Sequence, residues 1–422
     1  MALAGFCMVA GSGFLALLQD IPRHASVAVA SYLLLTVAAL IGMRLLWDRD
    51  DPNAVLLMLA VAVLVRLLFF GKAPFLSTDV YRYLWDGRVL LHGIDPYIVK
   101  PQDIAVHALR LDWLWSFIDW RSMPSLYPPF SLVLFALADK LDDRGLLGIK
   151  ALVEIGDLAV LGILIAALRQ RRMPAGRAAL YAWSPLVIVE FAWSGHQEVW
   201  CLAALAAAVL LYDRGSTIGS ALALAAAVLF KLYPAALIPS MYFRRPWAPV
   251  ATVAATVGVA YLPFVKANPN VVGFLPEFAT RYHFNDSLNG ALHTPLAMLS
   301  FLLCVVMSVW ARKSGLDFVK TMVLLIAAYL LLSPTVNPWY LTVFALLLPL
   351  VPQVFEGAFG PSMLGIFVWL AISLLGYAAE ASPAAHLVEY LPVFIGGAMS
   401  AARLTLPYLQ ALRPSLESDW GA

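Results

Sequence analysis

Long apolar runs recur along almost the whole chain, and they limit its possible folds more than any other feature. An α-helix needs about 17–25 such residues to cross the hydrocarbon core of a membrane. Hydrophobic residues occupy 62% of the 422 positions and charged residues 13%, against roughly 45–50% and about 25% in soluble domains. Because the short alternating segments of a transmembrane barrel do not occur in the sequence, we predict an all-α polytopic membrane protein.

The apolar runs predict about 12–14 transmembrane helices, several of them short. The candidate spans are residues 3–18, 27–47, 54–71, 148–168, 176–194, 198–213, 217–231, 233–243, 247–265, 292–311, 318–333, 338–352, 362–378 and 390–403. The first run lacks a basic start, which favours a retained span over a signal peptide. We expect one membrane domain, divided into N-terminal spans at 1–71, a long outer loop with juxtamembrane helices at 72–147, further spans at 148–403 and a cytoplasmic tail at 404–422.

An arginine-rich loop, Arg169–Arg177, predicts the orientation of the chain. It holds four arginines, and short loops rich in Lys and Arg remain in the cytoplasm. Counting spans from this loop leaves Arg244-Arg245 and Arg312-Lys313 inside, together with both termini. The segments that then share the outer face are 72–147, 195–197, 231–234, 266–291 and 333–337.

Two segments leave this count open. Residues 127–140 must stay on the outer side as a juxtamembrane or re-entrant helix, which Pro128-Pro129 favours because proline begins a helix but cannot continue one. Residues 217–243 form either a hairpin that turns at Lys231–Pro234 or one long kinked helix.

Charge and cysteine content exclude several classes of function. The net charge of +2 comes without a basic tract that carries interleaved aromatics, so we expect no nucleic-acid partner. Cys7, Cys201 and Cys304 lie inside apolar runs, where they are not placed to form disulfides or a spaced metal site. We expect no metal and no other cofactor.

The long outer loop carries the densest group of polar residues, beginning with Leu76-Ser-Thr-Asp-Val-Tyr-Arg-Tyr-Leu-Trp-Asp-Gly-Arg88. Apolar residues at helical spacing predict two amphipathic helices at the bilayer surface, Asp79–His92 and Leu109–Trp120. Asp79 is the first carboxylate after a span. It either accepts a proton as a general base or belongs to a helix N-cap with Ser77 and Thr78.

Other charged residues also have two interpretations. Arg82 and Asp86 form an ion pair one helical turn apart, or Arg82 binds a phosphate with its guanidinium. Lys231, at an outer turn, binds a phosphate as a point charge or extends to the membrane interface. Glu154 and Asp157 lie within a span and indicate a structural polar network more than a catalytic pair.

Two outer turns offer groups that hydrogen-bond sugars. Gly195-His-Gln-Glu198 suggests a metal site, but it lacks the HExxH spacing and any cysteine, so hydrogen bonding to sugar or phosphate is favoured. Arg281–Asn289 carries a cation, an imidazole, amides and aromatic faces. It either contacts sugar hydroxyls or is a hydrated loop.

Five ordered blocks resemble those of a known family. They are Ser77–Tyr83, Gly93-Ile-Asp-Pro-Tyr97, Leu126-Tyr-Pro-Pro129, Gly195–Glu198 and Ser333-Pro-Thr-Val-Asn-Pro-Trp-Tyr340. Between about residues 74 and 345 they resemble the polyprenol-phosphate-mannose-dependent mannosyltransferases, membrane glycosyltransferases of the GT-C architecture. The resemblance implies a GT-C-type helix bundle with Asp79 as its catalytic base. Asn337 stands where relatives often carry His, so an imidazole-dependent role is not expected there.

The resemblance also implies a reaction and its partners. The protein would move a hexose, expected to be mannose, from a polyprenyl-phosphate-sugar donor to a hydroxyl of a lipid or glycan acceptor, with inversion and without a metal. The protein would lie in a bacterial inner membrane, in contact with its lipids. Its active site would face the periplasm or the cell exterior. The expected substrate-binding residues are Arg82, Tyr83, Asp86, Tyr127, His196, Glu198, Lys231, Arg281, Asn285, Asn337 and Tyr340.

Two other classes of function remain as alternatives. A transporter or flippase of a lipid-linked sugar would use similar charged residues, but it predicts inverted repeats and charges near the membrane midplane. No repeat is visible in the sequence, and the polar blocks gather at one predicted face. A non-enzymatic membrane scaffold would not need an acidic and basic cluster facing one compartment.

Overall fold

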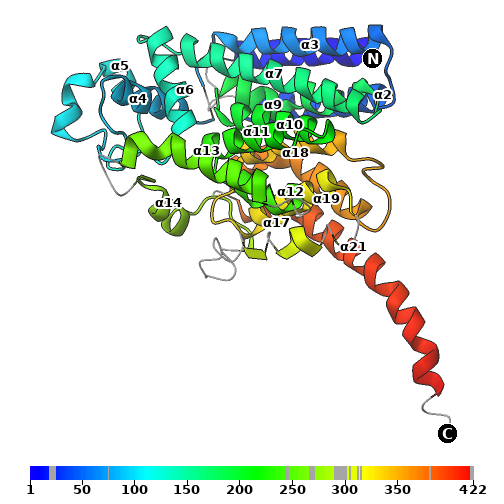
Figure 1. The fold of residues 1–422 in the computed structure, drawn as a ribbon. Coiled ribbons are helices and arrows are strands. Elements are labelled where there is room, and N and C mark those ends of the chain that lie inside the picture. The colour runs from blue at the N-terminus through cyan, green and yellow to red at the C-terminus, as the bar shows by residue number, and fades with distance from the viewer. Residues whose placement is uncertain are drawn as a thin grey trace.

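The described residues fold mainly into helices, many of them apolar (Figure 1). The computed structural model describes residues 1–18, 25–74, 76–242, 247–265, 271–288, 302–303, 306–310, 313, 316–379 and 382–418. Within these ranges there is no β-strand, and extended pairing is limited to one bridge between Phe284 and Thr335. The prediction of an all-α polytopic membrane protein is confirmed.

Most predicted spans match helices closely. Those long and apolar enough to cross a membrane are α3 (Pro52–Phe70), α7 (Leu147–Gln170), α13 (Trp247–Val265) and the first part of α21 (Pro383–Ser418). Other apolar helices are α1 (Ala2–Leu17), α2 (Ala25–Leu46), α10 (Glu198–Asp213), α11 (Thr217–Phe230), α17 (Phe318–Leu332), α18 (Thr342–Leu347) and α19 (Gly360–Ile372). The number of spans stays a prediction, because most of the candidate 292–311 lies outside the described residues, as do Arg244, Arg245 and Arg312.

The candidate span 176–194 is broken and not a single helix. It consists of a 3₁₀ turn (Ala175–Ala178), α8 (Ala179–Ala182), α9 (Pro185–Val187) and a π-helical turn (Ile188–Trp193). The break falls where Ser184 caps α9, its hydroxyl accepting from the Val187 N–H at 3.5 Å, with Pro185 as the first helical residue. Proline starts a helix readily but cannot continue the preceding one.

The segment 217–243 is a hairpin, so the kinked-helix alternative is wrong. Lys231 after α11 is extended, and the chain continues through a 3₁₀ turn (Tyr233–Leu237) into α12 (Ile238–Tyr242). Tyr242 returns to the start of α11, where its hydroxyl lies 2.8 Å from that of Ser220. The turn brings Lys231 to the same end of the bundle as the start of α10.

The long polar loop is anchored by two helices, α4 (Asp79–Leu91) and α6 (Pro129–Leu141), which pack together. Gly87 allows this approach, because a Cβ atom there would lie 2.2 Å from the backbone of Phe135. Figure 1 shows α4, the short helix α5 (Asp112–Trp115) and α6 gathered at one end of the horizontal helices α3 and α7. The loop is therefore a packed part of the fold.

The second predicted amphipathic helix, Leu109–Trp120, is wrong apart from the single turn α5. Arg110 and Arg121 lie over the ring of Trp115 at 4.0 and 4.5 Å. The guanidinium of Arg121 also donates to the carbonyls of Ile118 and Trp115 at 2.9 and 2.7 Å. These contacts bend the chain into a loop, a tertiary effect that helical spacing of apolar residues does not report.

Of the two carboxylates predicted to form a structural network, Asp157 does so, whereas Oε1 of Glu154 is buried without a hydrogen-bond partner among the described residues. Asp157 accepts from Arg66 Nε at 2.6 Å and from the Tyr181 hydroxyl at 2.6 Å, and so connects α3, α7 and α8. Arg66 also donates to the carbonyl of Ala182 at 2.9 Å. A charge removed from water is tolerated when it is paired and hydrogen-bonded in this way.

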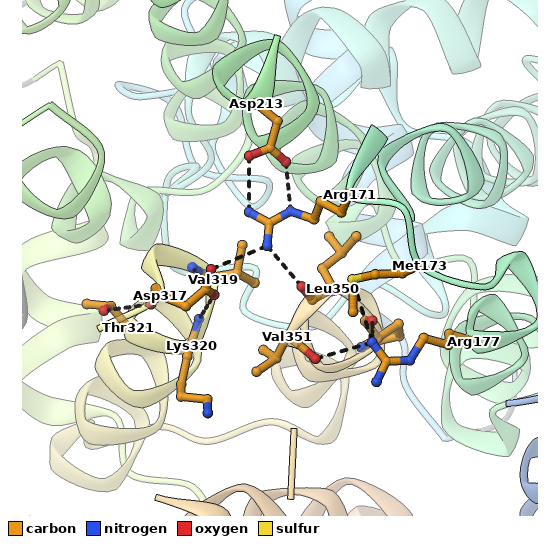
Figure 2. Close-up of polar contacts among 11 residues, drawn as sticks. Arg171, Met173, Arg177, Asp213, Asp317, Val319, Lys320, Thr321, Leu350 and Val351 are labelled. Atoms are coloured by element: carbon orange, nitrogen blue, oxygen red, sulfur yellow. Dashed lines mark hydrogen bonds and ion pairs between the residues drawn. The ribbon is translucent and has the colours of Figure 1, made fainter. Parts of the chain in front are cut away.

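A second polar cluster closes the end of the bundle opposite α4 and α6 (Figure 2). Arg171 donates to both carboxylate oxygens of Asp213, at 2.7 and 3.1 Å, and lies 3.5 Å from Asp317. Arg177 donates to the backbone carbonyls of Pro349 and Val351. The cluster connects the ends of α7 and α10 with the start of α17.

This cluster qualifies the sequence argument for orientation. Of the four arginines in the loop, Arg171 and Arg177 are held by protein partners, whereas Arg169 and Arg172 are exposed. Two cations are therefore free to act at a membrane surface. The cytoplasmic assignment of this loop stays a prediction.

Candidate active site

The polar segments predicted to share one face converge on a single pocket. Helix α4, the loop 119–128, the turn 231–233, α14 (Leu275–Arg281) and the segment 329–340 all contribute to its wall. The space amounts to about 1560 Å³ including its open mouth. The turn 195–197 packs just beneath, where the ring of His196 stacks on that of Trp339 with centroids 3.9 Å apart.

Asp79 lies at the start of α4 and lines the pocket. The N-cap position belongs to Thr78, and the described residues form no side-chain cap there; instead the Asp79 N–H donates to the Ser77 hydroxyl at 3.2 Å. Desolvation raises the pKa of Asp79, opposed by the neighbouring His196, Lys231 and Arg82 and reinforced by the negative charge of Asp119. The carboxylate is thus available to a substrate.

Asp119 is the second carboxylate in the pocket wall. The Thr78 hydroxyl donates a hydrogen bond to Asp119, so this side chain is tied to the residue before Asp79. No sequence argument selected it, because it lies 40 positions from Asp79 in a segment predicted as an amphipathic helix. Its only sequence signal is a carboxylate next to a tryptophan, Trp120.

Lys231 and Glu198 form an ion pair at the pocket. Nζ of Lys231 lies 2.8 Å from Oε2 of Glu198 and 4.1 Å from the centre of the Tyr340 ring. The Glu198 side chain is 1% exposed and that of Lys231 22%, so the lysine reaches the pocket and the carboxylate does not. Desolvation lowers the pKa of Lys231, but the charge and hydrogen bond of Glu198, together with Tyr340 and Cys201, raise that pKa above its ordinary value.

Arg82 lines the pocket, but protein partners take up its guanidinium. Nε donates to Asp86 at 2.8 Å, and the two terminal nitrogens donate to the carbonyls of Trp120 and Met123 at 3.0 and 2.9 Å. Arg82 is 9% exposed and Asp86 2%. This geometry favours the ion-pair interpretation over phosphate binding, although the pair is buried and not on the surface.

His196 and Glu190 form a buried pair beneath the pocket. Nδ1 of His196 lies 3.0 Å from both the backbone oxygen and Oε2 of Glu190, and the Tyr377 hydroxyl donates to the same carboxylate at 3.0 Å. His196 is not part of the pocket wall. Among the described residues no group of three or more His, Cys, Asp or Glu side chains is arranged to hold a metal ion.

The other predicted binding residues divide into two groups. Tyr83, Tyr127, Asn337 and Tyr340 line the pocket. Arg281 ends α14 as an exposed residue outside the wall.

Asn285 belongs with Arg281 outside the pocket wall, but it is buried and held by α21. Its side-chain amide donates to Glu389 at 3.1 Å, and its backbone carbonyl accepts from the Tyr390 hydroxyl at 2.6 Å. Both bonds come from a helix more than 100 residues further along the chain. The loop around Asn285 is therefore an anchored part of the fold, and its residue Tyr282 lines the pocket.

A pocket in a helix bundle that collects two carboxylates and a lysine is a candidate active site. The chain belongs to the MptA_B family of mannosyltransferases: the family model described as alpha-(1->6)-mannopyranosyltransferase, N-terminal domain, matches residues 8–244. It is also 27% identical over 189 residues to Alpha-(1->6)-mannopyranosyltransferase A of Corynebacterium glutamicum. That match includes 42% of this chain and spans 36% of the relative's length.

The family match confirms the resemblance drawn from the motifs, but it includes a different range of residues. It begins at residue 8, so the N-terminal spans, which the motifs did not include, belong to the family domain. It ends at residue 244, before the block Ser333–Tyr340. That block is connected to the family domain by the pocket itself, through the contact of Tyr340 with Lys231.

Proposed function

We propose that this protein transfers mannose from a polyprenyl-phosphate-mannose donor to a hydroxyl of a lipid or glycan acceptor, at the periplasmic or outer face of a bacterial inner membrane. Membership of a mannosyltransferase family supports the reaction type. The relative's name supports an α-(1→6) linkage. A lipid-linked donor is supported by the pocket's mixed lining, which joins charged residues to aliphatic and aromatic ones such as Leu232, Leu275 and Phe278.

The observation that carries the proposal is the meeting of Asp79 and Lys231 in one pocket. An unpaired carboxylate can accept the proton of an attacking hydroxyl. A lysine cation can stabilise the charge that develops on a departing phosphate. The positive charge of Lys231 acts on Asp79, so both roles are available to one bound substrate pair.

The proposed step is a single displacement at the anomeric carbon. The acceptor oxygen forms a bond to C1 of mannose while the bond from C1 to the phosphate oxygen breaks. The proton of the acceptor hydroxyl moves to the carboxylate of Asp79, and the electron pair of the broken bond leaves with the polyprenyl phosphate beside Lys231. Attack opposite the leaving group inverts the configuration at C1.

The test is Asp79→Asn in purified full-length protein, assayed for mannose transfer from polyprenyl-phosphate mannose. Losing a general base typically costs about 10²–10⁴-fold in rate. Since Asp79 makes no cap bond among the described residues, the variant should remain folded and bind the donor. Asp112→Asn, an exposed carboxylate of the same loop outside the pocket wall, is the matched control and should keep full turnover.

A folded Asp79→Asn protein that retains more than a tenth of wild-type turnover would assign the base to another residue. Asp119 would then come first, because it is the other carboxylate in the pocket wall. Asp86 and Glu198 would come after Asp119, because they are paired with Arg82 and Lys231. The same assay with EDTA tests the predicted metal independence, since loss of activity restored by a divalent cation would contradict it.

A further inference from the structure

Aromatic rings form one side of the pocket mouth. The rings of Trp120 and Tyr282 meet edge to face with centroids 5.2 Å apart, and Tyr282 stacks on Phe278 at 4.9 Å. All three residues line the pocket. Trp120 is 52% exposed, which leaves much of its ring open to a ligand.

The backbone of Trp120 is held in a conformation that tryptophan rarely adopts. Its φ is +55°, in the left-handed region that favours glycine and asparagine. The buried guanidinium of Arg82 fixes this conformation by donating to the carbonyls of Trp120 and Met123. A bulky residue kept in a strained conformation by buried partners is typical of functional sites.

The pocket is organised in two parts around Asp79. On one side, Thr78 is hydrogen-bonded to Asp119, and Arg82, one turn along α4, holds Trp120. The other part is formed by Lys231, with Glu198 behind it and Tyr340 beneath it. If the donor phosphate lies at Lys231, the part that contains Asp119 and Trp120 offers the acceptor a second set of polar and aromatic contacts, near enough for Asp119 to act on the charge of Asp79.

We infer that Trp120 and Tyr282 form a platform for the pyranose ring of a saccharide acceptor, with Asp119 accepting hydrogen bonds from its hydroxyls and Arg82 acting as the positioning residue of the platform. The inference rests on the proposed function and specifies which end of the site takes the acceptor. The apolar C–H face of a pyranose packs on an aromatic ring, and the hydroxyls at its edge need polar partners. A sugar pocket therefore combines aromatic walls with a few placed polar groups.

The backbone strain at Trp120 makes a sharp test possible. Trp120→Gly removes the ring but suits the left-handed conformation, so the loop should keep its shape. Trp120→Phe keeps an aromatic face. Phe117→Ala is the matched control, because Phe117 is an exposed aromatic of the same loop that stacks on Tyr81 outside the pocket wall.

Two measurements with an alkyl α-mannoside separate this inference from the proposed function. Binding of the mannoside alone is measured by calorimetry, and transfer from polyprenyl-phosphate mannose gives the KM for each substrate. Trp120→Gly should weaken mannoside binding and raise the acceptor KM by about five- to tenfold, with donor KM and thermal stability unchanged. Trp120→Phe should recover part of the mannoside affinity that Trp120→Gly loses, because it restores a smaller aromatic face, and Phe117→Ala should match wild type.

The inference is overturned if Trp120→Gly binds the mannoside as wild type does, or if it raises the donor KM as much as the acceptor KM. A wild-type protein that binds the mannoside through Trp120 but transfers no mannose would overturn the proposed function and leave the platform in place. Should Trp120→Gly be unstable, Tyr282→Leu provides the same test from α14's side of the mouth.

Discussion

Replacing Lys231 tests donor binding, but the structure shows that the simple substitution changes two things. Lys231→Met removes the proposed phosphate ligand, and it also strands the carboxylate of Glu198, which is 1% exposed. Removing one partner of a buried ion pair costs about 3–5 kcal/mol of stability. We expect the lower part of that range, because the Lys231 side chain is 22% exposed. A loss of activity in the single variant would therefore be ambiguous.

The double variant Lys231→Met with Glu198→Gln resolves this ambiguity. It removes both charges while keeping the length of both side chains, so its free energy of unfolding should lie within about 1 kcal/mol of wild type. If Lys231 binds the donor phosphate, the double variant loses a charge-assisted hydrogen bond and about 10- to 100-fold in donor affinity. Glu198→Gln alone keeps the cation and removes its competing partner, so donor affinity should be equal or higher.

The assay combines unfolding in mixed detergent micelles with donor KM and turnover for all three variants. The order of stability should be wild type and double variant together, with Lys231→Met well below. Donor affinity should be similar in Glu198→Gln and wild type. It should be lower in Lys231→Met and in the double variant. A stable double variant with wild-type donor KM would refute the reasoning and move the phosphate to another part of the pocket.

Two further predictions concern the pH dependence of the site and its orientation. Protonated Asp79 cannot act as a base. Desolvation together with Asp119 raises the pKa of Asp79. On acidification, turnover should therefore begin to fall at a higher pH than it would for a base with the ordinary pKa of an aspartate. Asp119→Asn removes a negative neighbour, lowers the pKa of Asp79 and should move this acid limb of the pH–rate profile to lower pH; an unmoved limb would contradict it. For orientation, Arg172→Cys and Ala105→Cys, both exposed, are labelled in sealed cells after the native cysteines are replaced. Position 105 should react from outside and position 172 only after permeabilisation, and the reverse pattern would invert the predicted topology.

The sequence alone determined the class of fold and most helix positions. Apolar runs and proline positions are local properties. Because backbone groups in lipid must be hydrogen-bonded within the protein, each apolar run forms a helix. The predicted spans at 54–71 and 148–168 accordingly coincide with α3 and α7. The motif around Asp79 was also readable, because a carboxylate at a junction between span and loop is itself a local pattern.

Only the tertiary structure decided which residues share the pocket. In the sequence, Glu198 and Lys231 were separate candidates for substrate binding, but in the structure they form one ion pair. Arg82 was a candidate for binding phosphate, but its guanidinium donates to the carbonyls of Trp120 and Met123. Asp119 and Tyr282 carried little signal, yet both line the pocket. The physical reason is that hydropathy and helical period depend on neighbours in the chain, whereas charge pairing and pocket shape depend on distances between segments that packing alone brings together.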